Sequence, residues 1–231
     1  MEVKLDDNYV CISALIDKSG SMANLNTTEL AQGLTNMIKE QCDMGKEVVF
    51  YGGSFNNEFK IFADGVDGST VKITQEHIMP DGMTALYPSF ARMIKYTGNK
   101  LSEMTDRRPG KVIFVLLSDG EQTINHLGNT RNNKDKPFEG NDAKENLKEL
   151  IGEHTDVWKW TFLYLGTNYD SIKAGTDLGI APTQCLNYAY TPMGSQQAMR
   201  ACSQAMGRIR SSQFNGFSNN EREMAMEDNY N

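Results

Sequence analysis

Apolar residues recur along the chain in two patterns, as short continuous runs and as stripes at helical spacing. The runs, such as residues 9–16 and 112–117, suit strands that are covered on both faces, as in a parallel sheet between helices. The stripes have apolar residues three and four positions apart, as in residues 30–42, which suits amphipathic helices. Their alternation predicts a doubly wound α/β domain, with a mostly parallel sheet and helices on both faces.

The boundaries of the elements follow from local signals. Asn26 and Glu29 have the spacing of a capping box ahead of the first helix, and Gly45 ends that helix. Residues 56–58 suit a tight turn between two strands, which predicts one antiparallel strand at the edge of the sheet. Those two strands are expected at residues 47–55 and 59–62, later strands at 158–165 and 184–188, and later helices from residue 86 and at 143–151, 168–178 and 198–209.

Polar segments flank this domain and interrupt it once. Residues 1–8 are expected to form a short leader, and residues 9–210 a single domain without repeats or a linker. Residues 211–231 lose periodicity and gain Asn, Ser and acidic residues, which predicts a flexible acidic tail. Residues 121–140 are also polar and aperiodic, and a loop of this length is either functional or disordered.

The composition argues against membrane and nucleic-acid partners. The chain has 231 residues, of which 39% are hydrophobic, so it can bury a sizeable core. No apolar run approaches the ~20 residues that cross a bilayer, and the N-terminus lacks the pattern of a signal peptide, which predicts a cytoplasmic protein. A net charge of -7 disfavours binding to nucleic acid, and the local basic run at residues 92–111 suits a solvated helix face and loop.

The cysteines and histidines show no metal-ligand spacing. Each cysteine stands alone within an apolar pattern, which predicts reduced core residues. Each histidine is isolated and is expected to be structural or solvated. These residues are Cys11, Cys42, Cys185 and Cys202, and His77, His126 and His154.

Oxygen-bearing side chains stand at the ends of three expected elements. Asp17, Ser19 and Ser21 follow the first strand, Thr84 precedes the helix from residue 86, and Asp119 follows the strand at 112–117. Ligands of open α/β sheets bind beyond the carboxyl ends of the strands, so the two aspartates would meet there if their strands are neighbours. A compact set of oxygen ligands suits Mg²⁺ or Mn²⁺ rather than a soft metal. Each of these residues alone is common at the end of a strand or helix, and only their combination predicts a metal site.

This set resembles the metal-ion-dependent adhesion site of the von Willebrand factor A (vWA) family, whose signature is Asp-x-Ser-x-Ser, then a Thr, then an Asp. The resemblance runs over residues 9–210, and residues 162–180 resemble the back half of uncharacterised bacterial and phage members. It implies that Ser19, Ser21 and Thr84 bind the ion directly, and that Asp17 and Asp119 bind directly or through water. It also implies a partner protein whose Asp or Glu completes the coordination.

The expected function is therefore a Mg²⁺-dependent protein-binding module rather than an enzyme. One alternative is a metal-dependent hydrolase, in which Glu121 or Asp81 activates a metal-bound water. Against it, Ser19 replaces the second acid of the Asp-x-Asp phosphohydrolases, and the chain has no phosphate-binding Gly-Lys-Ser loop or dinucleotide fingerprint. Another alternative is a scaffold in which the ion only joins loops.

The acidic tail adds a hypothesis about self-association. A carboxylate on a mobile segment can compete for an open metal position at a high effective concentration. The tail would then mask its own site or occupy that of a second copy. The residues concerned are Glu221, Glu223, Glu227 and Asp228.

Overall fold

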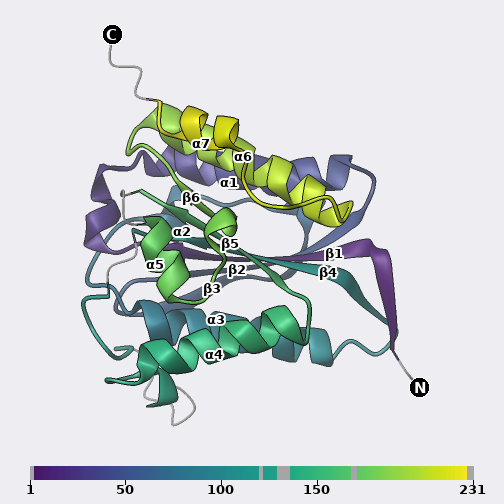
Figure 1. Ribbon diagram of the computed structural model, residues 1–231, viewed down its shortest axis with the longest axis horizontal. Coiled ribbons are helices and arrows are strands. Elements are labelled where there is room, and N and C mark those ends of the chain that lie inside the picture. The colour runs from purple at the N-terminus through teal and green to yellow at the C-terminus, as the bar shows by residue number, and fades with distance from the viewer. Residues whose placement is uncertain (1–2, 120–121, 129–135, 168–170, 228–231) are drawn as a thin grey trace.

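The structure is a computed structural model, and it describes residues 3–119, 122–128, 136–167 and 171–227. Within these ranges a six-stranded sheet lies between two layers of helices, as Figure 1 shows, which confirms the predicted fold class. The strands are β1 (Lys4–Asp17), β2 (Glu47–Phe55), β3 (Phe59–Asp67), β4 (Arg107–Leu117), β5 (Thr161–Gly166) and β6 (Cys185–Asn187). The helices are α1 (Thr27–Asp43), α2 (Gln75–Ile78), α3 (Leu86–Ser102), α4 (Ala143–Asp156), α5 (Ser171–Asp177), α6 (Pro192–Arg210) and α7 (Asn219–Ala225).

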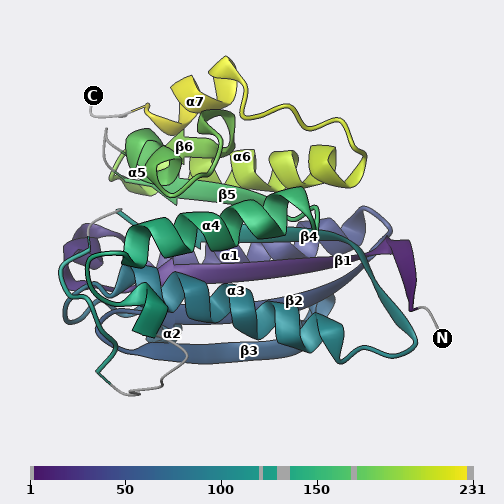
Figure 2. The same cartoon turned by 60° about the horizontal axis from the view of Figure 1, so that its bottom comes forward.

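The sheet has the strand order β3-β2-β1-β4-β5-β6. Strand β1 pairs in parallel with β2 and with β4, and β5 and β6 continue the parallel set. Strand β3 pairs antiparallel with β2 and lies at the edge of the sheet, which confirms the predicted hairpin (Figure 2). The chain winds from β1 toward β2 on one side and from β4 toward β5 on the other. The winding direction therefore changes between β1 and β4.

The apolar side chains of β1 alternate between two cores. Val10, Ile12 and Ile16 pack with residues of α1, α6 and α7 on one face of the sheet, while Cys11 and Leu15 pack with residues of α3 and α4 on the other. All five are fully buried. The long apolar run is thus explained by a strand that is covered on both faces.

Strand β1 begins at Lys4, so the expectation of a leader over residues 1–8 is wrong from that residue on. Lys4 and Leu5 pair with the start of β4, and the register then shifts between Asp6 and Val10. Residues 4–8 gave no strand signal because four of these five side chains are exposed. This part of the strand is held by backbone pairing and by an ion pair between Arg107 and Asp6 at 3.1 Å.

The expectation of a flexible tail is also wrong over residues 211–227. Helix α7 begins with a capping box between Ser218 and Glu221. The carboxylate of Glu221 is 7% exposed and accepts hydrogen bonds from both terminal nitrogens of Arg208 at 2.9 Å. Glu221 is therefore not a mobile carboxylate, as the self-association hypothesis required, and Asp228 lies outside the described residues.

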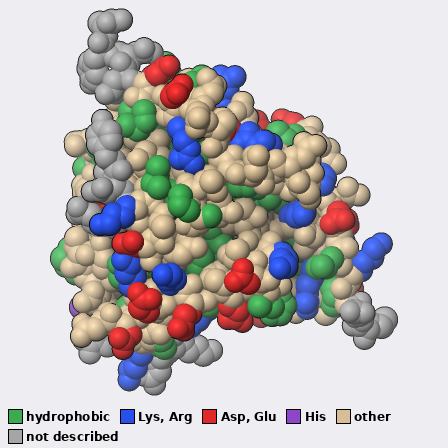
Figure 3. All heavy atoms as spheres, in the orientation of Figure 1, with side chains coloured by type: hydrophobic (Ala, Val, Ile, Leu, Met, Phe, Trp, Pro, Cys, Tyr) green, Lys and Arg blue, Asp and Glu red, His purple; other side chains and the backbone are tan. Residues whose placement is uncertain are grey.

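The surface charge is mixed rather than segregated. On the face seen in Figure 3, Lys and Arg side chains alternate with Asp and Glu side chains over the described part of the chain. Residues of the basic run contact the protein itself, as when Lys100 lies 2.9 Å from Asp64. No helix in the described ranges is long and apolar enough to span a membrane.

Candidate metal centre

Asp17 and Asp119 lie at the carboxyl ends of the two central strands. Asp17 is the last residue of β1, and Asp119 follows the end of β4 by two residues. The strands are parallel neighbours, with Ile16 opposite Leu117, so both aspartates lie where the winding direction changes. Their charges interact, because Asp119 contributes to raising the pKa of Asp17.

Asp17 is a buried carboxylate, 1% exposed, that accepts two hydrogen bonds. Its Oδ1 accepts the backbone N–H of Ser19 at 2.8 Å, and its Oδ2 accepts the hydroxyl of Ser118 at 2.7 Å. Burial raises the pKa of Asp17 to about 6, although the hydrogen bonds from Ser19 and Ser118 act in the opposite direction. No Lys or Arg of the described chain forms an ion pair with Asp17. The residue is a buried negative charge without a protein cation.

The two serines present their hydroxyls side by side. The Oγ atoms of Ser19 and Ser21 are 3.0 Å apart, with Ser19 buried and Ser21 exposed. The chain turns there into a short 3-10 helix, Gly20–Asn24. The pair therefore extends from the buried carboxylate of Asp17 to the solvent.

Backbone hydrogen bonds hold the loop that carries Thr84 against the serine loop. The N–H of Gly20 donates to the carbonyl of Gly82 at 2.9 Å, and the N–H of Asp81 donates to the carbonyl of Lys18 at 2.8 Å. Thr84 is 2% exposed and lies two residues before α3, next to the helix N-terminus, as predicted.

The backbone conformation at position 82 favours glycine. Its φ is +74°, a conformation that L-residues rarely adopt, and a Cβ would lie 2.2 Å from Oδ1 of Asn57. Asn57 and Asn56 belong to the turn between β2 and β3, and Asn56 accepts the N–H of Ala85 at 2.9 Å. The β2–β3 turn thus supports the Thr84 loop as well.

The residues that hold Thr84 in place carry no signal in the sequence. The Oγ1 of Thr123 accepts the N–H of Thr84 at 2.7 Å, and the carbonyl of Thr84 accepts the N–H groups of Thr123 and Ile124 at 3.0 and 3.1 Å. Nearby, Oε1 of Gln122 accepts the N–H of Tyr87 at 2.8 Å, in the first turn of α3. The segment after Asp119 therefore fixes Thr84. Part of the polar loop at 121–140 has this positioning role, which no periodicity signals.

Three tyrosines near the ends of β5 and β6 were also missed. The hydroxyl of Tyr164 donates to the carbonyl of Ser118 at 3.3 Å, and that of Tyr190 donates to the carbonyl of Ser21 at 2.5 Å. The hydroxyl of Tyr188 is buried and has no hydrogen-bond partner in the described chain. Burial raises the pKa of all three hydroxyls, and the charges of Asp17 and Asp119 raise them further. These tyrosines are therefore neutral and add no charge to the site.

The five predicted residues thus come from three loops that meet at one edge of the sheet, and the donors suit a hard cation. All offer oxygen, and the buried Asp17 lacks a counter-charge. In the described ranges no three His, Cys, Asp or Glu side chains form a cluster suited to a metal ion, so the hydroxyls would have to contribute ligands. Of the acids considered for catalysis, Asp81 is exposed, and Glu121 lies outside the described residues.

No protein-family model and no curated protein sequence matches the chain. Solved structures match it in fold. The PilB minor pilin from Streptococcus sanguinis has a TM-score of 0.57 and 13% identity, covering 93% of this chain and 63% of the pilin. A von Willebrand factor type A protein from Catenulispora acidiphila has a TM-score of 0.52 and 14% identity, covering 88% of this chain and 42% of that protein.

A manganese-loaded TRAP protein from Plasmodium vivax also matches, with a TM-score of 0.51 and 14% identity, covering 80% of this chain and 70% of that protein. The chain spans less than two thirds of the length of the pilin and of the Catenulispora protein. At these identities the similarity establishes the architecture alone. The chain has the fold of vWA domains.

Proposed function

We propose that the protein binds Mg²⁺ or Mn²⁺ through Asp17, Ser19, Ser21, Thr84 and Asp119, and uses the ion to hold an Asp or Glu of a partner protein. The observation that carries the proposal is Asp17, a buried carboxylate whose hydrogen-bond donors are neutral. Taking an unpaired charge out of water is costly, and a bound cation would offset that cost.

The charge balance of the site favours a third carboxylate. Asp17 and Asp119 together neutralise a divalent ion, and the hydroxyls of Ser19, Ser21 and Thr84 add ligands without adding charge. The ion would keep its affinity for a negatively charged ligand from outside. An octahedral ion such as Mg²⁺ would take that ligand in place of a water molecule.

The exposure of Ser21 argues for binding rather than for a purely structural ion. Ser19 and Thr84 are buried, whereas Ser21 is exposed, so the donor set has one side toward solvent. A structural ion is normally enclosed by its ligands, whereas a functional one keeps an open position. The manganese-loaded TRAP protein shares the fold, which makes Mn²⁺ a reasonable second ion to test.

The proposal includes no catalytic step. The four cysteines are unpaired, and burial raises the pKa of each thiol, which disfavours nucleophilic thiolates. The exposed Asp81 is the acid nearest in sequence to Thr84. A non-enzymatic role and a cytoplasmic location stay predictions.

Thermal unfolding with MgCl₂ or with EDTA tests the metal site. A ligand that binds only the folded state adds about 2.7 kcal/mol at a concentration of 100 Kd. We expect Mg²⁺ to raise the Tm of the wild type by several degrees, and Asp119→Ala to abolish the rise. Asp81→Ala, which removes a nearby exposed carboxylate, should keep it. An equal rise in the Asp17→Ala/Asp119→Ala double variant would refute the site.

A further inference from the structure

We propose that two exposed methionines in the loop that carries Thr84, Met79 and Met83, bind a large apolar side chain of the partner next to the Asp or Glu that the ion holds. This inference rests on the proposed function and adds a requirement to it. The partner would present a single carboxylate with Leu, Ile, Met or Phe one or two positions away. We call Met79 and Met83 the methionine rim.

Met83 lies between two residues whose backbones are hydrogen-bonded to other parts of the candidate site. The carbonyl of Gly82 accepts the N–H of Gly20 at 2.9 Å, and the N–H of Thr84 donates to Oγ1 of Thr123 at 2.7 Å. Consecutive Cα atoms are about 3.8 Å apart, so Met83 is close to Thr84, one of the proposed ligands. A partner side chain that reaches the ion from solvent therefore comes close to Met83.

Both methionines are exposed, although apolar residues next to them in sequence are buried. Met79 is 49% exposed and Met83 is 54% exposed, whereas Ile78, Ala85 and Leu86 are exposed by 2% or less. The buried residues anchor the two ends of the loop in the core, and the methionines stay in solvent. Exposed apolar side chains that gather beside polar groups mark interaction surfaces.

The backbone of this loop is fixed before any partner binds. The N–H of Asp81 donates to the carbonyl of Lys18 at 2.8 Å, and Nδ2 of Asn56 donates to the carbonyl of Asp81 at 2.8 Å. Ordering a loop costs free energy on binding, and a loop that is already ordered avoids this cost. The methionine side chains are unbranched and flexible, so they adapt to apolar side chains of different shape.

The charge of the loop favours an apolar neighbour over a second acid. Asp81 lies between the two methionines in sequence, and its side chain is exposed. It forms no ion pair with a Lys or Arg of the described chain. The ion would hold one carboxylate of the partner, whereas a further acid beside it would be repelled by Asp81.

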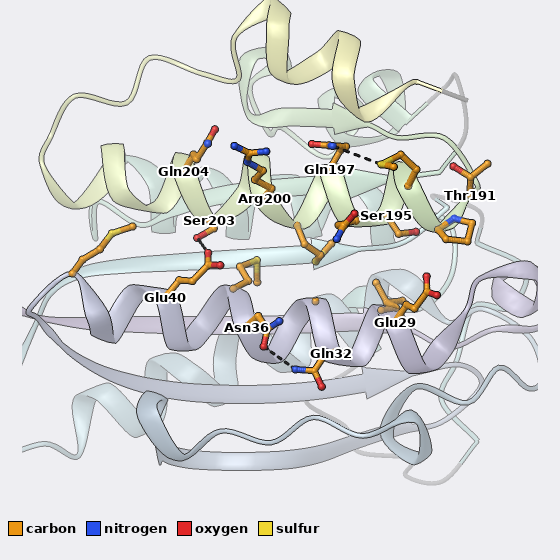
Figure 4. Close-up of a pocket in the computed structure, with 18 residues that line it drawn as sticks. Glu29, Gln32, Asn36, Glu40, Thr191, Ser195, Gln197, Arg200, Ser203 and Gln204 are labelled. Atoms are coloured by element: carbon orange, nitrogen blue, oxygen red, sulfur yellow. Dashed lines mark hydrogen bonds between the residues drawn. The ribbon is translucent and has the colours of Figure 1, made fainter. Parts of the chain in front are cut away.

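The groove between α1 and α6 suits such a partner less well. It has a volume of about 1000 Å³, and Figure 4 shows Glu29 and Glu40 of α1 along it. Arg200, on the α6 side, also lines a smaller hollow beside α7. A segment that presents an acid would meet like charges on α1, so the methionine rim is the better contact surface.

Peptide selection tests the inference. A library with one fixed Asp and randomised flanks is selected on the immobilised full chain in MgCl₂ and eluted with EDTA, and Kd values are measured for the recovered peptides. We expect a large apolar residue within two positions of the Asp, and an affinity about tenfold lower for Met83→Ser. Met79→Ser should lose less, because Met79 is further from Thr84 in sequence. Met83→Leu keeps an apolar side chain and should bind as the wild type does.

Met44→Ser is the matched control. Met44 is 53% exposed, nearly the same as Met83, but it caps the C-terminus of α1 ahead of β2, at the opposite end of the strands. Peptide affinity should be unchanged in this variant. All four variants should keep the Mg²⁺-induced rise of Tm, because the methionines are not among the proposed ligands.

Each other outcome overturns the inference in a distinct way. Recovered peptides without an apolar preference, or an unchanged Kd in Met83→Ser, would leave the metal site standing and remove the methionine rim. A Tm of Met83→Ser that no longer rises in Mg²⁺ would show that Met83 shapes the metal site instead of contacting the partner. Dimers of the chain that form in Mg²⁺ and are lost in Met83→Ser would assign the rim to a second copy. A selection that returns no Mg²⁺-dependent peptide would remove the partner role together with the rim, while the thermal shift of the wild type still reports on the metal site.

Discussion

The amino ends and the carboxyl ends of the neighbouring strands β1 and β4 differ in how their charges are balanced. At their amino ends, the exposed chain places Arg107 3.1 Å from Asp6, and Arg107 also contacts Glu47. A hydrogen bond from the N–H of Asn8, with help from Arg107, lowers the pKa of Asp6. At the carboxyl ends, Asp17 is buried among hydroxyl groups, and burial raises its pKa to about 6.

The difference is one of counter-charge. At the amino ends, Arg107 neutralises Asp6. That ion pair is exposed to water, where such a pair changes the free energy of unfolding little. At the carboxyl ends, the buried Asp17 forms no ion pair with a Lys or Arg of the described chain, so its negative charge is a cost to the folded state unless something outside neutralises it. Identical side chains at the two ends of one strand therefore have different roles, and substituting each tests the contrast.

The largest effect is expected for Asp17→Asn measured in EDTA. Asn keeps an acceptor for the N–H of Ser19 and removes the buried charge. A pKa raised from 3.8 to about 6 corresponds to a cost of ~3 kcal/mol when the group is ionised. We expect Asp17→Asn to unfold at a higher temperature than the wild type at pH 7 without metal, and to show no Mg²⁺-induced rise. A lower Tm in EDTA would contradict the proposed charge imbalance.

The same substitution predicts a pH dependence. Because the folded-state pKa of Asp17 is raised, its favourable contribution is complete below about pH 4 and is lost as the pH rises through about 6. In EDTA, the Tm advantage of Asp17→Asn over the wild type should therefore shrink as the pH falls from 7 to 4. With Mg²⁺, the stabilisation of the wild type should grow over the same range as the pH rises. A Tm difference that does not change with pH would contradict this account.

A smaller effect is expected for Gly82→Ala, which disturbs the carboxyl ends through the backbone. A left-handed conformation costs an L-residue about 1–2 kcal/mol, and the new Cβ would also displace Asn57. We expect a lower Tm and a weaker Mg²⁺ response. Gly45→Ala is the control, because Gly45 has a φ of +78° with nothing within 4 Å of an added Cβ. If both variants lose equal stability, the contact with Asn57 is unimportant.

Thr123→Val should cost less, about 1 kcal/mol, because it removes one acceptor from the backbone N–H of Thr84. We also expect Mg²⁺ to raise the Tm of Thr123→Val less than that of the wild type, since Thr84 would be less firmly held. Thr123→Ser keeps the hydroxyl and should behave as the wild type. A full Mg²⁺ response in Thr123→Val would show that the clamp does not position Thr84 for the ion.

The smallest effect is expected for Asp6→Asn, the counterpart of Asp17→Asn at the amino end. Its ion pair is exposed to water, so the Tm should stay within a degree or so of the wild type. The Mg²⁺ response should be unchanged. A large change in either quantity would erase the contrast between the two ends of the strands.

The sequence sufficed for the fold and for the positions of the five oxygen donors. Periodicity places β1, β4 and the helices, and once β1 and β4 are neighbours, Asp17 and Asp119 must share an edge. Their role as metal ligands stays a prediction. The start of β1 at Lys4 was not predictable, because its exposed side chains carry no alternation and its partner, Arg107, is distant in sequence.

The clamp on Thr84 and helix α7 were missed for a related reason. Thr123 contacts Thr84 through one side-chain and one backbone hydrogen bond, within a segment that has no period. Helix α7 depends on Arg208 and on the carbonyl of Ala225, which accepts the N–H of Ala189 at 2.8 Å. The clamp leaves no local pattern in the sequence, whereas α7 does have one local signal, the capping-box spacing of Ser218 and Glu221, without an apolar stripe to support it.

The segment after α6 has a consequence for aggregation. Strand β6 has three residues and forms the outer edge of the sheet, where free carbonyls could recruit the strand of another molecule. Arg222 donates to the carbonyl of Cys185 at 2.7 Å, and the N–H of Phe217 donates to the carbonyl of Thr183 at 2.8 Å. Residues 216–225 therefore cap this edge. A chain shortened before them would expose an unprotected strand and invite edge-to-edge association.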